Sequence, residues 1–316
     1  MNQSDISIIR SVSITDTEQN GGRPDFASTV VSGVKFNLFP RVTSAERETG
    51  ITRYRKAFIA NSNVNGETAY SACVCIGTPG NGQDRFYIAP AEIDDTQAHL
   101  PSEWTGCGKL TQSATAGDSS INLLFKSSDY SIPQGALLLI QDDEKSCNIR
   151  VASVSKNVNT AAVTLEGQLP YSFETDETYC GVMLELGDLK PVLESSSLNS
   201  LTGVFDHSLV VLSNGGTEYD TFSLTFTSAL SFSSAGLYAG ALPSGQTTAQ
   251  YAPVNPKTGR PYFTIPAEAW SGTFEAGNSL TLVTLPSAKG FWLKEVVPAG
   301  CPHEPDNRIT LDWQID

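Results

Sequence analysis

The sequence has few of the residues that metal, redox and acid–base sites use most. Its 316 residues include six cysteines, three histidines and two methionines. Histidine-based catalysis therefore has few candidates, and the cysteines are too sparse for the dense disulfide framework of small secreted domains. No run of 18 apolar residues occurs, so we expect no helix that spans a membrane and no membrane partner.

Positive charge is also scarce, because 20 lysines and arginines stand against 34 aspartates and glutamates, a net charge of −14. A phosphate backbone would repel most of such a surface, so we expect no nucleic-acid partner. The first residues lack the basic start and apolar stretch of a secretory signal. We therefore expect a soluble protein made in the cytoplasm, with its cysteines as thiols.

Glycine and proline are plentiful, at 26 and 17 residues, and short alternating segments lie between glycine-rich turns. These features are typical of many short strands. We predict a mostly β fold with several antiparallel sandwich or barrel modules and an extended N-terminal arm. The predicted parts are an arm at 1–40, a first β domain at 41–110 that could join the C-terminal part, an inserted small barrel or sandwich at 111–187, and a C-terminal sandwich at 188–316.

Local patterns predict individual elements within these parts. We expect a short helix at 43–49 that ends at Gly50. In the strand expected at 51–59, alternation places Arg53 and Arg55 on one face and Lys56 on the other. Further strands are expected at 69–76, 236–239 and 279–285.

Six of the 20 basic residues fall between positions 35 and 56, beside only two acids, so this window carries +4 and the rest of the chain −18. Two interpretations are open. The cations could form a contact patch for an acidic protein surface, or they could pair with acids of their own domain. From the first interpretation we predict a protein interface at Arg41, Arg47, Arg53, Arg55 and Lys56.

Two groups of residues invite a metal-site or catalytic interpretation. Cys73 and Cys75 lie on one face of a predicted strand and could meet Cys301 and His303, but the spacing matches no common zinc motif. Asp206-His207-Ser208 has the letters of a triad, yet adjacent strand residues point to opposite faces. We predict no metal, no cofactor and no catalytic residues.

Acids and aromatic residues leave two further functions open. Glu92, Asp94 and Asp95 could serve glycoside hydrolysis, although solvated loop acids explain them more simply. The aromatic residues of the last third could stack on sugars, although most should be core. They are Tyr251, Tyr262, Phe263, Trp270, Phe274, Phe291, Trp292 and Trp313.

Short motifs at both ends of the chain resemble a known family. Gly21-Gly22, Asn37-Leu38-Phe39-Pro40 and the strand from Arg53 to Phe58 are similar to the N-terminal region of structural proteins of tailed bacteriophages, particularly those of Mu-like and contractile-tailed phages. The stretch from Trp292 to Gly300 is similar to the tryptophan strand and Val-Pro-Ala-Gly turn near their ends.

This resemblance implies a noncatalytic virion structural protein of the tail or baseplate region, located in the virion. Its expected partners are other virion proteins and copies of itself, which it would contact through the arm and the basic patch. The alternatives are a carbohydrate- or receptor-binding β protein of the virion, with a host glycan as partner, a head or neck decoration protein, and a depolymerase that uses Glu92, Asp94 or Asp95.

Overall fold

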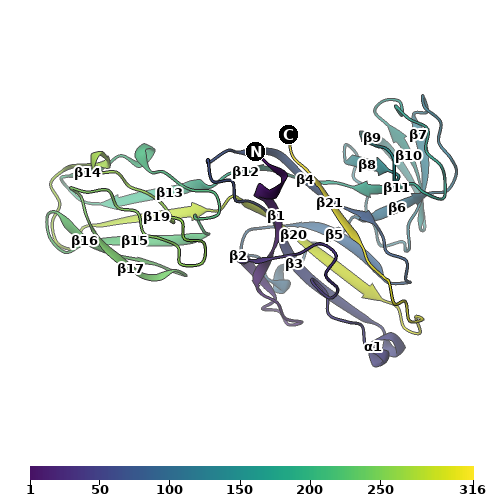
Figure 1. Cartoon of the computed structure of the whole chain (residues 1–316), viewed down its shortest axis with the longest axis horizontal. Coiled ribbons are helices and arrows are strands. Elements are labelled where there is room, and N and C mark those ends of the chain that lie inside the picture. The colour runs from purple at the N-terminus through teal and green to yellow at the C-terminus, as the bar shows by residue number, and fades with distance from the viewer.

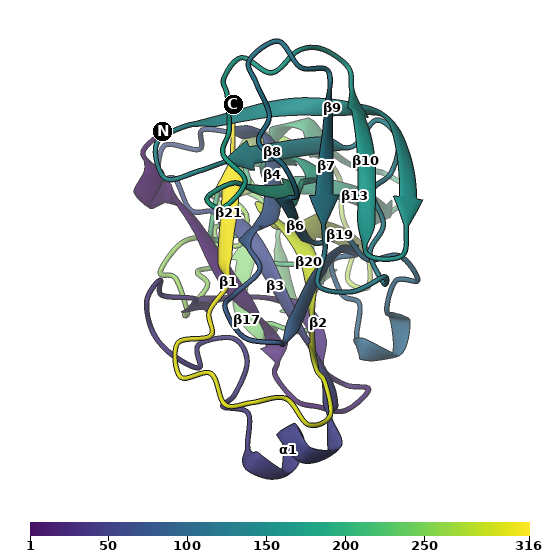
Figure 2. The same cartoon turned by 90° about the vertical axis from the view of Figure 1, so that its right-hand side faces the viewer.

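A computed structural model describes all residues from 1 to 316. Strands hold 48% of the residues and helices 6%, which confirms the predicted mostly β class. Three β modules lie along the longest axis (Figure 1), with a central module between a barrel and a C-terminal sandwich. Both termini lie at one end of the central module, and helix α1 (Ser44–Thr49) lies at the other, as Figure 2 also shows.

The central module is built around strand β3 (Ile51–Asn61), the middle strand of a five-stranded antiparallel sheet. Its order is β2-β1-β3-β20-β5, in which the other strands are β1 (Ile6–Ser13), β2 (Gly21–Thr29), β5 (Arg85–Ala91) and β20 (Ala288–Val297). Strand β3 pairs with β1 and with β20, and both of its faces are covered. Its residues from Lys56 to Asn61 are therefore buried without interruption.

A smaller sheet packs on one face of the first. It has the order β12-β4-β21, with bounds β4 (Ala69–Thr78), β12 (Leu184–Leu189) and β21 (Thr310–Gln314). Val74 and Ile76 of this sheet pack against Ala57, Phe291 and Leu293 of the other. The opposite face of the larger sheet is covered by the segment after β5, through Ile93, Leu100 and Trp104.

Two expectations about the chain ends require correction. Residues 1–40 are not a separate arm, because β1 and β2 are ordered strands of the central sheet and Ile6 and Ile9 are buried in its cores. Residues 288–316 do not belong to the C-terminal sandwich, because β20 and β21 pair with strands of the first third of the chain. Hydrogen bonds between segments far apart in sequence thus close the central module.

The barrel lies between β5 and β12 in sequence and closes in the order β10-β7-β6-β11-β8-β9. Its 17 core residues form one apolar cluster, so it has a core of its own. The strands are β6 (Cys107–Leu110), β7 (Ser120–Leu124), β8 (Leu137–Gln141), β9 (Ser146–Asn157), β10 (Thr160–Leu165) and β11 (Tyr179–Val182).

The C-terminal sandwich lies between β12 and β20 in sequence. A five-stranded sheet, β13-β19-β15-β16-β17, faces a two-stranded sheet of β14 and β18 across a core rich in aromatic rings. The strands are β13 (Val192–Asn199), β14 (Gly203–Phe205), β15 (Asp220–Phe226), β16 (Ser231–Gly236), β17 (Gly240–Gln246), β18 (Trp270–Gly272) and β19 (Ser279–Leu285).

Helices are few and short. The α1 helix starts with the capping box of Thr43 and Glu46 and stops at Gly50, whose φ of 78° suits glycine, as the sequence predicted. The remaining helices are single 3-10 turns at η1 (Gln3–Asp5), η2 (Gln97–His99), η3 (His207–Leu209) and η4 (Ala267–Ala269). None of these helices has the length and apolar character needed to cross a membrane.

Candidate functional site

Arg53 of the predicted basic patch lies inside the central module, where only 2% of it is exposed. Its guanidinium is 3.3 Å from a carboxylate oxygen of Glu295, the residue opposite it on β20, and 2.6 Å from one of Glu46. It also donates a hydrogen bond to the carbonyl of Pro40 at 3.0 Å. All of these partners come from its own chain.

Arg55 and Lys56 are buried as well. The Arg55 guanidinium is 2.6 Å from a carboxylate oxygen of Asp16. The Lys56 ammonium donates to the carbonyl of Asp95 at 3.0 Å and lies over the ring of Trp292. Because β3 is the central strand and both of its faces are covered, these cations cannot form a surface patch. The predicted interface at Arg53, Arg55 and Lys56 is therefore wrong, and pairing within the chain is correct for the two arginines.

Burial changes the acid–base behaviour of this interior. It raises the pKa of Glu295 to about 7, although the nearby Arg53 acts in the opposite direction. Burial also lowers the pKa of Lys56 to about 8, an effect that the charges of Asp95, Asp94 and Glu92 partly offset. The central sheet therefore holds two charged groups in surroundings that favour their neutral forms.

The other two predicted interface residues lie at α1. Arg41 is exposed and precedes the helix, and Arg47 is a half-buried residue within it. Together with His303 they line a hollow of about 250 Å³, which we call the basic hollow. Its remaining lining residues are Val42, Thr43 and Ser44. No carboxylate lies within 4.0 Å of its three basic side chains. Sequence reasoning considered His303 only as a metal ligand, because 256 residues separate it from Arg47.

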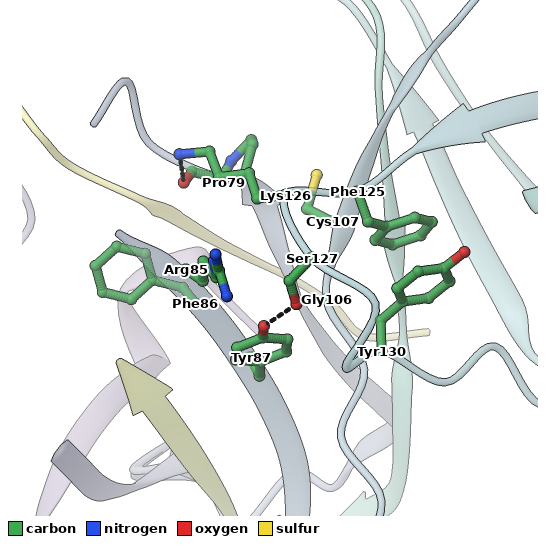
Figure 3. Close-up of a pocket in the computed structure, with 10 residues that line it drawn as sticks. All are labelled: Pro79, Arg85, Phe86, Tyr87, Gly106, Cys107, Phe125, Lys126, Ser127 and Tyr130. Carbon is green, nitrogen blue, oxygen red and sulfur yellow. Dashed lines mark hydrogen bonds between the residues drawn. The ribbon is translucent and has the colours of Figure 1, made fainter. Parts of the chain in front are cut away.

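A second feature is the joint between the barrel and the central module (Figure 3). The Lys126 ammonium of the barrel points into the loop after β4 and donates to the carbonyls of Pro79, Gly80, Gly82 and Asp84, at 2.6 to 3.3 Å. Beside it, the hydroxyls of Tyr87 and Ser127 are 2.5 Å apart. The cavity at this joint measures about 20 Å³, which is space for a single water molecule.

More contacts lie along the same joint. Leu139 of β8 and Met183 pack on Cys73 and Cys75 of β4 in a small apolar cluster. At its edges, the Arg150 guanidinium binds both carboxylate oxygens of Glu185, and the Gln141 amide donates to Asp312 at 2.5 Å. The barrel is thus attached to the central module over an extended area, through apolar and polar contacts together.

The joint between the C-terminal sandwich and the central module is mainly polar. Glu218, which is 3% exposed, lies 3.2 Å from the Arg23 guanidinium and 3.4 Å from the Lys257 ammonium. It also accepts a hydrogen bond from the Asn255 amide. Nearby, Arg260 donates to the carbonyls of Ser62 and Asn214. The contacts of Arg23 with Glu218 and of Arg260 with Ser62 cross the boundary between the two modules.

The candidate metal ligands occupy different surroundings. The Cys73 thiol donates to the carbonyl of Ser71, the buried Cys75 lies opposite Asp312, and the Cys301 thiol is 4.0 Å from an oxygen of Asp84. No three histidine, cysteine, aspartate or glutamate side chains are placed to hold a metal ion.

The candidate catalytic residues make local structural contacts. Asp206 accepts hydrogen bonds from the backbone and hydroxyl of Ser208, at the start of a 3-10 turn. Asp94 accepts from the Tyr219 hydroxyl, and Asp95 accepts from the backbone of Glu92. The carboxylates of Asp94 and Asp95 are therefore used to order a loop and to contact the C-terminal sandwich.

The aromatic residues proposed for sugar stacking lie in the cores. Seven of the eight are buried, and Trp313 is half-buried. In the C-terminal sandwich, the rings of Phe226 and Phe274 stack 4.3 Å apart, and Trp270 packs edge-on against both. These faces contact other rings, so no row of them is presented to a ligand.

Searches of protein-family models, of curated proteins and of solved structures gave no match to this chain.

Proposed function

We propose that this chain is a noncatalytic structural protein of a tailed-bacteriophage virion, in the tail or baseplate region. In this role it holds two β modules at fixed positions on either side of a central module. The proposal combines the resemblance of the short motifs at both ends with the architecture of the three modules.

The observation that carries the structural role is the construction of the two joints. Each inserted module is attached at both of its ends to the central module, because the chain enters and leaves it between strands of the central sheets. Each joint also has charged groups with several partners, Lys126 at the barrel and Glu218 at the sandwich. Hydrogen bonds to charged groups are stronger than neutral ones, so such joints resist relative motion. A fixed arrangement suits a component that spaces its neighbours in an assembly.

Peptide mass spectrometry on density-purified phage particles from the source tests this proposal. We expect this chain at a fixed ratio to the major capsid protein, and well below it, in every fraction that contains intact particles. An abundant host protein measured in the same fractions is the control for contamination. Absence of the chain from intact particles would contradict the proposal, and a ratio near that of the capsid protein would place it in the head.

A further inference from the structure

Arg41, Arg47 and His303 come together at α1 to form the basic hollow. We propose that this hollow binds a carboxylate-rich peptide segment of a neighbouring protein in the assembly. The nature of the neighbour rests on the structural role proposed above. Binding of the segment itself rests only on the hollow.

The arginines of the basic hollow differ from the buried arginines because they have no carboxylate partner. Arg53 and Arg55 have carboxylate partners within their own chain, whereas Arg41 and Arg47 have none within 4.0 Å. Glu46 and Glu48 flank Arg47 in the sequence. The exposed Glu48 forms no ion pair within 4.0 Å, whereas the carboxylate of Glu46 accepts hydrogen bonds from Thr43 and pairs with the buried Arg53. This acid is therefore turned toward the interior and leaves the two outer guanidinium groups available.

Contacts between α1 and the turn before His303 hold the hollow in place. The backbone of Gly300 donates to the carbonyl of Arg47 at 2.7 Å, which fixes the turn before His303 against α1. A Cβ atom at Gly50 would lie 3.0 Å from the backbone of Ala299, so the two segments are in close contact. The Arg47 guanidinium also donates to the Ser44 hydroxyl at 3.2 Å. Segments far apart in sequence thus present their cations from a fixed framework.

The charge and size of the hollow suit acidic side chains. Arginine binds carboxylates through two parallel N–H bonds, and a hollow of about 250 Å³ has room for acidic side chains. A nucleic acid would have to extend its phosphates beyond the hollow, over a chain that carries −18 outside the window from 35 to 56. A short acidic peptide avoids this repulsion because its charges can be confined to the hollow. Because the positive charge is confined to the hollow and the rest of the chain is acidic, the hollow favours a short acidic peptide over a nucleic acid.

The experiment measures fluorescence anisotropy of a labelled hexaglutamate peptide with the full-length protein, and a hexaglutamine peptide serves as the uncharged comparison. We expect the wild type to bind hexaglutamate, binding to weaken as ionic strength rises, and no binding of hexaglutamine. The double variant Arg41→Ser/Arg47→Ser should bind at least about tenfold more weakly. The matched control, Lys190→Ser/Lys289→Ser, removes two positive charges at the other end of the central module and should bind like the wild type.

Two results would overturn the proposal. One is the absence of hexaglutamate binding by the wild type, and the other is equal weakening by both double variants, which would indicate an effect of total charge only. Displacement of the peptide by a single-stranded oligonucleotide at lower concentration than by unlabelled hexaglutamate would assign the hollow to nucleic acid instead. Thermal unfolding of each variant checks that it is folded. Because purified protein is used, failure here leaves membership of the particle open, and the particle measurement decides that separately.

Discussion

Cations from one short window of the sequence reach opposite environments in the fold. Arg53, Arg55 and Lys56 lie on the central strand of a sheet and are buried, whereas Arg41 lies on the surface. Arg47 lies with it at the basic hollow. The difference arises from the elements that carry them, because both faces of β3 are covered and α1 packs at the edge of the module. A cluster of basic residues in a sequence therefore predicts that these charges need acidic or polar partners or water. It does not predict whether the residues are buried or exposed.

We call Arg53, Arg55 and Lys56 the inner cations, and Arg41 and Arg47 the outer cations. The inner cations require partners inside the fold, because a buried charge is stable only with them. Arg53 meets this constraint with two carboxylates and a carbonyl, whereas Lys56 has one carbonyl and two aromatic rings. The outer cations need no partner, since water solvates them. The four predictions below test this contrast, in order of decreasing effect on stability.

Replacing Arg53 with methionine should have the largest effect. Above the pKa of Glu295 the substitution leaves a buried carboxylate without its cation, and loss of one member of a buried pair costs about 3–5 kcal/mol of unfolding free energy. Near pH 7 Glu295 takes up a proton instead, so the loss should be smaller there. Urea unfolding at about pH 9, followed by circular dichroism, measures the full change. The double variant Arg53→Met/Glu295→Met should recover most of the loss, because well-packed apolar residues can replace a buried pair. A loss below about 1 kcal/mol for the single variant would show that the pair is not buried as described.

The second largest effect should be a pH dependence of the unfolding free energy that is caused by Glu295. Its pKa is raised from 4.5 to about 7 in the folded protein, so the folded state binds the proton more tightly than the unfolded state does. The unfolding free energy should therefore fall as the pH rises from about 4.5 to 7, by at most about 1.4 kcal/mol per pH unit from this group. Glu295→Gln should remove this slope, as urea titrations across the range can measure. An unchanged slope would assign the effect to other groups.

Lys56 should cause a smaller pH dependence of the unfolding free energy, opposite in sign to that of Glu295. Its pKa is lowered from 10.5 to about 8, so the charged form destabilises the folded state below that pH and this penalty disappears as the pH rises toward 10.5. Lys56→Met should therefore raise the unfolding free energy at pH 7 by roughly 1–2 kcal/mol, because an apolar side chain suits the site better. The gain should vanish near pH 10. A variant that is less stable than the wild type at pH 7 would show that the hydrogen bond to Asp95 outweighs the cost of burial.

Sequence reasoning succeeded where a strand or turn has a local signal. The short helix that stops at Gly50 and strands such as β4 and β19 follow from local signals of this kind. It failed where distant segments decide the outcome. Segment 236–239 was predicted as a strand from its apolar residues, yet it lies at the turn between β16 and β17, and the polar strand β13 was missed.

The candidate site was harder to predict for the same reason. Alternation correctly separates Arg53 and Arg55 from Lys56 on β3, but it carries no information about what covers each face. The covering segments come from residues near 16, 40, 95 and 295, so burial depends on the complete topology. The basic hollow likewise needs His303, which only the return of β20 brings to α1.

The outer cations should have the smallest effect on stability. Arg41 and Arg47 have no carboxylate partner, so Arg41→Ser/Arg47→Ser should change the unfolding free energy by less than about 0.5 kcal/mol, the usual range for surface substitutions. Urea unfolding at a pH where Glu295 is charged, with Arg53→Met measured alongside, makes the contrast between inner and outer cations quantitative. A loss comparable to that of Arg53→Met would mean that the outer arginines hold the fold together. A change near zero, combined with the loss of hexaglutamate binding, would instead separate their role from folding, because a residue that can be removed without cost to the fold is free to serve a partner.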